Sequence, residues 1–327
     1  MKKNVGINGF GRFAHHLLKY WIGNPKSKFD IKYINDEYLS LNEALDILRN
    51  DEKIDFKDYS IENKDNVITF NKNDSNEVYK IIYTNLQLTN IEWLGLPDLV
   101  FECSGKHTNA KECDIYLKSN TKKVLISATS ATADQTSIYG FNSKQILSES
   151  KILSYGSCTV NAFVPLANYI NNKYEVLNSD VNVVHNIQAY KLDNFKDIKR
   201  HPCTLQISGP NLLNFLNDDN FMVNYTLIPF SGISSMDFRF ATKKKVDLEN
   251  FINDLGNEIK NGSLKDLYGF NNNEGKPSDY LMTPKNLELI KKNIKLKHDN
   301  IYLQGYFDNE NSGTRFFDIA NLLCDMI

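Results

Sequence analysis

Cys158 is the residue whose type and position most directly suggest chemistry. It follows a predicted strand at 151–154 and a glycine, and it opens a predicted helix with apolar residues at i, i+3 and i+4 spacing. Ser157 suits the N-cap, so Cys158 is expected at the positive end of the helix dipole, which favours a thiolate. Pro165 cannot donate to the carbonyl of Asn161, so a kink or a bound water is expected there. On this local evidence a thiol that serves only packing is the alternative.

A glycine-rich turn near the N-terminus has the pattern of a dinucleotide-binding motif. Residues 4–8 predict a buried strand, residues 12–22 a helix, and residues 31–35 a second strand that ends at Asp36. The glycines between strand and helix let the backbone approach a pyrophosphate, and the carboxylate binds ribose hydroxyls. Asp36 would repel a 2′-phosphate, which favours NAD over NADP; a plain tight turn is the alternative. The candidate cofactor residues here are Gly9, Phe10, Gly11, Arg12, Phe13 and Asp36.

The rest of the first half continues a doubly wound α/β pattern. Its predicted elements are a helix at 41–49, antiparallel strands between 61 and 82, buried strands at 98–103 and 123–127, and a helix at 110–118. Ser104, Gly105 and Ser127 follow these buried strands, where such a sheet binds its cofactor. Ordinary strand-end turns are the alternative for each of them.

The second half shifts to longer alternating strands. These are predicted at 179–185, 234–241 and 301–307, with an irregular loop over 186–210 and an exposed loop over 271–279. An amphipathic helix ends the chain. The predicted fold is a Rossmann-type NAD-binding domain of residues 1–156, with the helix 314–327 packing back on it. A catalytic domain of residues 157–313 follows, built on a mostly antiparallel sheet.

Composition sets broad bounds on function. The chain has 327 residues, enough for two domains, with 41% hydrophobic and 24% charged residues. A net charge of −2 gives no electrostatic case for binding nucleic acid or a membrane surface. Five cysteines without framework spacing indicate reduced thiols, and no run of 18 apolar residues occurs. A cytoplasmic protein is expected, and no constellation of metal ligands is evident.

In this order, the motifs resemble glyceraldehyde-3-phosphate dehydrogenase over essentially the whole chain. His185 lies 185 − 158 = 27 residues after Cys158, where that family carries its catalytic histidine, although a structural role is common for a histidine on a strand. The segments that carry the resemblance are Asn8-Gly-Phe-Gly-Arg12, Ile34-Asn-Asp36, Ser157-Cys-Thr-Val-Asn161 and Phe307-Asp-Asn-Glu310. They are similar to the family's N-terminal signatures, its Ser-Cys-Thr-Thr-Asn motif and its Tyr-Asp-Asn-Glu motif.

The resemblance implies a mechanism. Cys158 would attack an aldehyde as a thiolate held in an ion pair with His185, and His185 would take the hydroxyl proton as hydride leaves for NAD. The main-chain N–H of Cys158 would stabilise the oxyanion. Inorganic phosphate would convert the resulting thioester to an acyl phosphate. Asn309 would hold the nicotinamide carboxamide, and a homotetramer is implied.

The phosphate sites are where the chain departs from the family. Residues that match or neighbour the family's phosphate-binding positions are Ser157, Thr159, Gln188, Arg200, Ser208 and Gly209. Leu227, however, stands where the family has an arginine, Gln188 where it has a threonine, and Tyr190 where it has an aspartate. Asn311 replaces a tryptophan and Gly313 a tyrosine. One charged hydrogen bond is worth about 1.5–3 kcal/mol, so the loss of the arginine bears directly on the substrate.

Three hypotheses follow. The first is an NAD-dependent enzyme that oxidises glyceraldehyde 3-phosphate, or a closely related small aldehyde, to an acyl phosphate. The second is a paralogous dehydrogenase for a different aldehyde, with hydrolysis of the thioester. The third is a non-catalytic NAD-binding scaffold that kept the fold.

Overall fold

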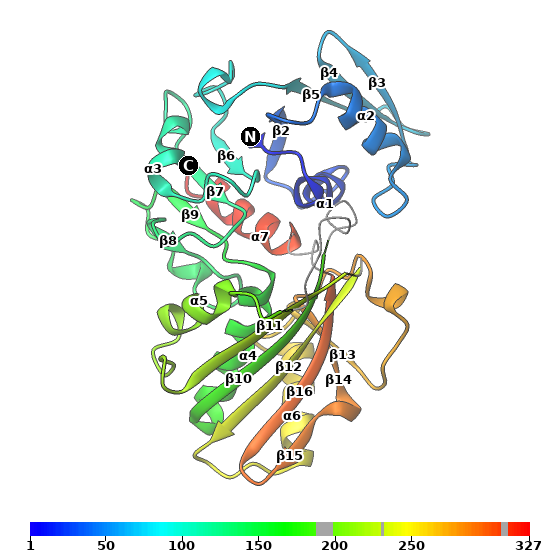
Figure 1. Cartoon of the computed structure of the whole chain (residues 1–327). Coiled ribbons are helices and arrows are strands. Elements are labelled where there is room, and N and C mark those ends of the chain that lie inside the picture. The colour runs from blue at the N-terminus through cyan, green and yellow to red at the C-terminus, as the bar shows by residue number, and fades with distance from the viewer. Residues whose placement is uncertain (188–198, 230–231, 309–312) are drawn as a thin grey trace. The chain divides into compact units, whose positions relative to one another are not determined.

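The chain forms two compact units, each built on its own sheet (Figure 1). The structure is a computed structural model, and it describes residues 1–187, 199–229, 232–308 and 313–327. The first unit comprises Met1–Gly156 and Gly313–Ile327, and the second comprises Ser157–Ser312. Among the described residues, no helix combines the length and the apolar character that crossing a membrane requires.

The first unit contains a nine-stranded, mostly parallel sheet in the order β3-β4-β5-β2-β1-β6-β7-β9-β8. Its strands are β1 (Lys3–Asn8), β2 (Phe29–Asn35), β3 (Tyr59–Lys64), β4 (Val67–Lys72), β5 (Val78–Thr84), β6 (Leu99–Glu102), β7 (Lys123–Ile126), β8 (Gln135–Thr136) and β9 (Ile152–Ser154). Of the described pairings in this sheet, β3–β4 and β4–β5 are antiparallel and the rest are parallel. The Rossmann-type sheet with an antiparallel insertion is therefore confirmed.

Helices complete the first unit. They are α1 (Arg12–Trp21), α2 (Leu41–Asn50), α3 (Ala110–Cys113) and α7 (Gly313–Cys324), with 3-10 turns η1 (Leu88–Asn90), η2 (Asp114–Tyr116) and η3 (Ser143–Gln145). Ser40 starts α2 through a capping box with Glu43. The C-terminal helix α7 packs on α1, where the rings of Tyr20 and Phe317 meet at 5.0 Å. The helix predicted over 110–118 is one α-turn followed by η2, which brings the Tyr116 hydroxyl to a buried glutamate, Glu102.

The second unit contains a mixed sheet in the order β11-β10-β12-β16-β14-β13, with β15 paired to β16. Its strands are β10 (Val176–Asn186), β11 (Phe221–Ile228), β12 (Ile233–Thr242), β13 (Tyr268–Asn271), β14 (Leu287–Ile290), β15 (Lys295–Lys297) and β16 (Asn300–Asp308). Four described pairings are antiparallel, whereas β10–β11 and β13–β14 are parallel. The sheet is mostly antiparallel, as predicted.

One face of this second sheet is covered by helices (Figure 1). They are α4 (Cys158–Tyr174), α5 (Thr204–Leu212) and α6 (Leu248–Asn261), and the 3-10 turns are η5 (Pro277–Tyr280) and η6 (Lys291–Asn293). Phe163 of α4 stacks on Phe240 and contacts Phe221 of β11. Side chains alternate between the faces of a strand. In β10, Val181 and Val183 are buried on the α4 face. Odd-numbered residues of β10 and β11 therefore face the helices.

The irregular loop expected over 186–210 is wrong at its end, because α5 begins at Thr204. Gly209 and Pro210 are poor helix formers, so the sequence carried little helical signal there. Contacts with the second sheet stabilise this helix instead. Gln206 bonds the edge of β11 twice, to the carbonyl of Phe221 at 3.1 Å and from the N–H of Val223 at 2.7 Å.

Side chains from distant segments repair the helix around Pro165. Asn286 donates its amide to the carbonyl of Asn161 at 2.9 Å, so a side chain takes the place of the bound water expected there. One turn on, the Tyr268 hydroxyl accepts from the N–H of Leu166 at 3.1 Å and donates to the carbonyl of Ala162 at 2.8 Å. The helix that carries Cys158 is thus held by residues more than a hundred positions away.

Buried His15 of α1 should control stability at acid pH. Its Nδ1 bonds the Gly11 carbonyl at 2.9 Å, Nε2 is buried without a partner in the described structure, and burial lowers its pKa from 6.5 to about 4. A folded-state pKa below the unfolded value gives stability that is complete above pH 6.5 and is lost as the pH falls toward 4. Protonation should cost about 2–3 kcal/mol by pH 4.5.

Urea denaturation of the wild type and of His15→Phe at pH 7.5 and 4.5 measures this loss. The variant should lose about 2–3 kcal/mol less than the wild type between the two pH values. An identical pH dependence in the two proteins would rule His15 out as the titrating group.

Candidate functional site

Polar side chains meet where the parallel strands of the first sheet end. Asn35, at the end of β2, donates to Asn8 at 2.9 Å, and Asn8, at the end of β1, donates to Glu102 at 2.9 Å. Glu102 is buried at the end of β6 and also accepts from the Ser104 N–H at 2.8 Å and from the Tyr116 hydroxyl. Sequence reasoning missed Asn8 and Glu102 as organisers of this edge, although both are polar residues that end buried strands. Their network fixes the backbone that follows each strand.

The glycine turn has the geometry that a bound pyrophosphate needs. Gly9 has φ +90°, and a Cβ there would lie 2.3 Å from backbone atoms of Ser104, so only glycine fits. A Cβ at Gly11 would meet no atom within 4 Å, and Gly11 caps α1 without any side-chain bond. The N-terminus of α1 is therefore open to an anionic ligand, which suits a dinucleotide.

Asp36 ties the second strand to the glycine turn. One carboxylate oxygen accepts from the Phe10 N–H at 2.6 Å, and the other accepts from the N–H groups of Tyr38 and Leu39, each at 2.9 Å. The carboxylate remains partly exposed, so its free lone pairs can meet ribose hydroxyls. Asp36 and the glycine turn thus form one unit.

The other predicted cofactor residues of the first unit have side chains that pack or pair within that unit, or lie where a strand ends. The Phe10 side chain is fully buried, Phe13 packs on Tyr155 and Phe316, and Arg12 pairs with Asp51. Gly105 has φ +70° with open space beside its Cα. Ser104 and Ser127 follow β6 and β7, and the Ser127 N–H donates to the Glu102 carbonyl at 2.9 Å. These residues lie at the strand ends where the sequence predicts cofactor contacts.

Cys158 and His185 lie together in the second unit. Cys158 is the first residue of α4, whose N-cap Ser157 accepts from the Val160 N–H, and its Sγ is 3.8 Å from His185 Nε2. His185 Nδ1 is 2.6 Å from the Asn186 carbonyl. Because that carbonyl can only accept, Nδ1 carries the proton and Nε2 is left to accept from the thiol. This is the arrangement of a nucleophile and its general base.

Burial of both groups opposes the thiolate–imidazolium pair that the sequence predicts. Burial raises the pKa of Cys158 to about 12, and the nearby Cys203 thiol adds to the rise. The N–H groups of Cys158 and Thr159 at the start of α4 act in the opposite direction, but burial is the larger effect. Burial also lowers the pKa of His185 to about 4. Both shifts favour a neutral thiol and a neutral imidazole at neutral pH.

Iodoacetamide labelling of Cys158 should follow this protonation state. Because the thiolate is the reactive form and its pKa lies far above neutrality, the labelling rate should rise about tenfold per pH unit from pH 6 to 9. Stopped-flow labelling with mass-spectrometric assignment to Cys158 measures it. A rate that is flat above pH 6 would mean that the ion pair already exists in the free protein.

Three hydroxyl groups gather at the start of α4. Ser157 Oγ lies 3.2 Å from Thr159 Oγ1 and 3.2 Å from Thr204 Oγ1, at the N-terminus of α5. Thr159 Oγ1 is also 3.8 Å from Cys203 Sγ. Sequence reasoning missed Cys203 and Thr204 because it read this segment as a loop.

The predicted phosphate residues Ser208 and Gly209 lie one turn further along α5. Both are buried, and a Cβ on Gly209 would strike the Phe221 ring at 2.7 Å. Gly209 therefore serves helix–sheet packing, and Thr204 is the residue of α5 that the structure brings to Ser157.

Uncharged side chains of the second sheet flank His185. Leu227 of β11 is its register partner, and the rings of Tyr225 and Phe307 lie 5.3 and 5.9 Å from its ring. Alternating residues 221–228 could have revealed β11 and hence Tyr225, which sequence reasoning missed. Gln188, Tyr190, Asn309 and Asn311 lie outside the described residues.

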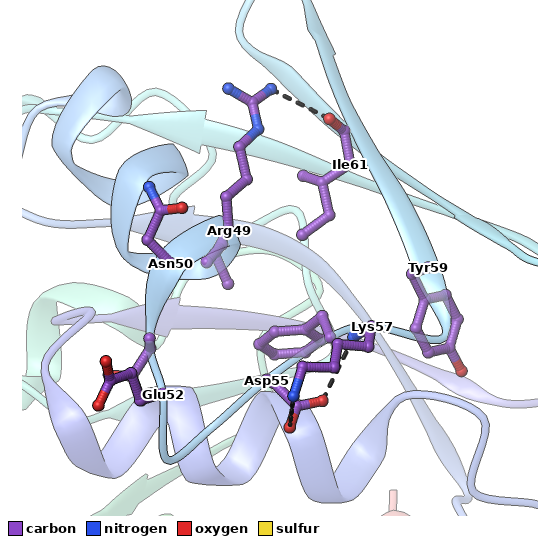
Figure 2. A pocket seen from close by; sticks show the side chains of 10 residues that line it. Arg49, Asn50, Glu52, Asp55, Lys57, Tyr59 and Ile61 are labelled. Atoms are coloured by element: carbon purple, nitrogen blue, oxygen red, sulfur yellow. Dashed lines mark hydrogen bonds and ion pairs between the residues drawn. The ribbon is translucent and has the colours of Figure 1, made fainter.

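A hollow of about 380 Å³ in the first unit lies between the end of α2, the loop after it and β3 (Figure 2). Arg49 donates to the Ile61 carbonyl at 3.0 Å, and Lys57 lies 3.5 Å from Asp55. Two basic side chains of the lining thus bond to other residues of the lining, which is typical of a structural loop.

The described fold is a Rossmann-type unit joined to a unit with a mixed sheet that carries a cysteine–histidine pair. Over nearly its full length the chain is similar, at low identity, to proteins named glyceraldehyde-3-phosphate dehydrogenase. It is 26% identical to glyceraldehyde-3-phosphate dehydrogenase 1 of Giardia intestinalis, over 100% of this chain and 97% of that protein. It is 24% identical to glyceraldehyde-3-phosphate dehydrogenase 2 of Nostoc sp., over 98% of both chains. The Mucor circinelloides enzyme is 32% identical over 186 residues, 57% of this chain and 53% of its own. No protein-family model matches the chain.

Proposed function

We propose that this protein is an NAD-dependent dehydrogenase that oxidises a small aldehyde through a thioester on Cys158. The observation that carries the proposal is the 3.8 Å approach of Cys158 Sγ to His185 Nε2 at the N-terminus of α4. A packing thiol needs no such partner, whereas a nucleophile needs a base within reach of its proton.

The residues act in a defined order. Cys158 attacks the aldehyde carbon while its proton passes to His185 Nε2, so a neutral pair becomes reactive as the bond forms. The Cys158 N–H stabilises the developing oxyanion. His185 gives this proton to the oxyanion, which becomes the hemithioacetal hydroxyl, and takes it back as the hydride leaves the same carbon. Bound NAD supplies the hydride acceptor, and the product on Cys158 is a thioester.

The cofactor is NAD, held by the glycine turn and Asp36. The open N-terminus of α1 accepts the pyrophosphate, and Asp36 takes the ribose hydroxyls while repelling the 2′-phosphate of NADP. Gly9, Gly11 and Asp36 contribute most directly, because Arg12 and Phe13 are engaged elsewhere in the first unit.

Inorganic phosphate resolves the thioester to an acyl phosphate. The hydroxyls of Ser157, Thr159 and Thr204 at the start of α4 and α5 form a polar group suited to bind it. By similarity to the relatives, the aldehyde is glyceraldehyde 3-phosphate or a close analogue. A cytoplasmic homotetramer is part of the proposal, from composition and resemblance.

NADH formation from NAD and glyceraldehyde 3-phosphate, with and without phosphate, tests the function. Phosphate-dependent turnover supports it. Leu227 beside His185 favours a second candidate, oxidation of a different aldehyde with hydrolysis of the thioester. Free acid as the product in an aldehyde screen would support that alternative. NAD binding without turnover of any aldehyde would support the third hypothesis, a non-catalytic NAD-binding scaffold.

A further inference from the structure

Lys199 and Arg200, next to the edge strand β11, lie on opposite faces of the second sheet by strand register. Arg200 forms an antiparallel bridge with Thr226 of β11, and the His201 N–H donates to the Tyr225 carbonyl at 2.9 Å. Antiparallel partners share a face of the sheet. Arg200 therefore lies on the Thr226 face, which is the face away from α4.

Lys199 alternates to the other face. One step back from the bridge, Lys199 stands opposite Leu227, whose partner on the other side is His185. Since the α4 face carries the odd-numbered residues of β10 and β11, the three residues form a row: Lys199, Leu227 and His185. Two strand spacings separate Lys199 from His185, about 10 Å between their Cα atoms, and a flexible lysine side chain spans much of that distance. Lys199 is exposed, and in the described part of the chain no carboxylate pairs with it.

We propose that Lys199 is the specificity-determining cation of the catalytic site, and that it binds a phosphate group beside Cys158 and His185. The proposal rests on the proposed function and replaces Arg200, the residue that the sequence favoured for this role. The Leu227 side chain cannot bind an anion. Lys199 therefore supplies the positive charge on the α4 face of the sheet, in the same row as His185. The phosphate is either that of the aldehyde or the inorganic phosphate that attacks the thioester, and one ammonium group suits both.

Cys158 labelling by charged and neutral reagents tests the placement without any turnover. Iodoacetate and iodoacetamide react with the same thiol but differ by one negative charge. In low salt at pH 8.5, Lys199→Ala should lower the iodoacetate-to-iodoacetamide rate ratio about two- to fivefold, as expected for one charge a few ångströms away in water. Lys199→Arg should preserve the ratio, and 1 M salt should abolish the difference. Arg200→Ala is the matched control and should leave the ratio unchanged. A fall in Arg200→Ala but not in Lys199→Ala would overturn the proposal.

Steady-state kinetics then identify which phosphate is bound. If Lys199 holds the aldehyde's phosphate, Lys199→Ala should lower kcat/KM for glyceraldehyde 3-phosphate about 10- to 150-fold and that for unphosphorylated glyceraldehyde less than about twofold. If it holds inorganic phosphate, the KM for phosphate should rise with both aldehydes. No change in any of these constants would overturn the proposal. A wild type that turns over no aldehyde would refute the proposed function and leave the labelling result to decide on Lys199.

Discussion

Cys158→Ala is expected to abolish aldehyde-dependent NADH formation, with a loss on the order of 10⁴-fold or more in kcat/KM. The nearest sulfur to take its place is that of Cys203, which reaches Thr159 rather than His185 Nε2. Without the thiol no covalent intermediate forms, so the pre-steady-state burst of NADH should vanish as well. Coupled absorbance assays and rapid mixing measure both quantities.

The control separates this loss from a general effect of removing a cysteine. Cys324→Ala changes a buried thiol at the end of α7, in the other unit, and should retain activity within about twofold once its stability is matched. NAD affinity of Cys158→Ala should equal that of the wild type, because the glycine turn and Asp36 are untouched. Residual turnover above 1% in Cys158→Ala, on the order of 100 times more than expected, would rule the cysteine out as the nucleophile.

His185→Asn is expected to lower kcat/KM on the order of 10²–10⁴-fold, the usual contribution of a general base. Because the free pair is neutral, the base is needed twice, first to take the thiol proton and then to take the hydroxyl proton. The variant should therefore lose most of its activity near pH 7, and the loss should shrink at pH 9.5 as hydroxide takes over the first proton.

A matched histidine far along the chain provides the control. His298 is exposed in the turn between β15 and β16 with φ +50°, a conformation that asparagine accepts. His298→Asn should leave kcat/KM and its pH profile unchanged. If His185→Asn shows the same fold-loss at pH 7 and 9.5, His185 positions the site and does not move the first proton.

Local sequence signals predicted the fold well where the chain is regular. The strands that end at Asn8, Asn35 and Ser154, the helix after Gly11 and the helix from Cys158 all lie within a few residues of their predicted places. The spacing of Cys158 and His185, together with the family resemblance, also predicted the pair that the structure brings together.

The failures have physical causes. Residues 204–212 lack a side-chain cap and contain glycine and proline, so contacts with α4 and β11 are needed to stabilise them as a helix. The protonation state of Cys158 depends on burial by residues distant in sequence, which outweighs the helix N-terminus that local reasoning could see. Which of Lys199 and Arg200 faces His185 depends on strand register, and a shift of one residue exchanges the two.

The side-chain bonds to α4 around Pro165 can form only after much of the chain beyond Cys158 has been synthesised. The carbonyl of Asn161 is satisfied by Asn286, 125 residues later, and the next turn by Tyr268, 106 residues after Ala162. A nascent chain that has left the ribosome only as far as residue 260 carries Cys158 but neither of these anchors. The helix that carries Cys158 is therefore completed late in synthesis, and a product truncated before Tyr268 would lack both of these bonds.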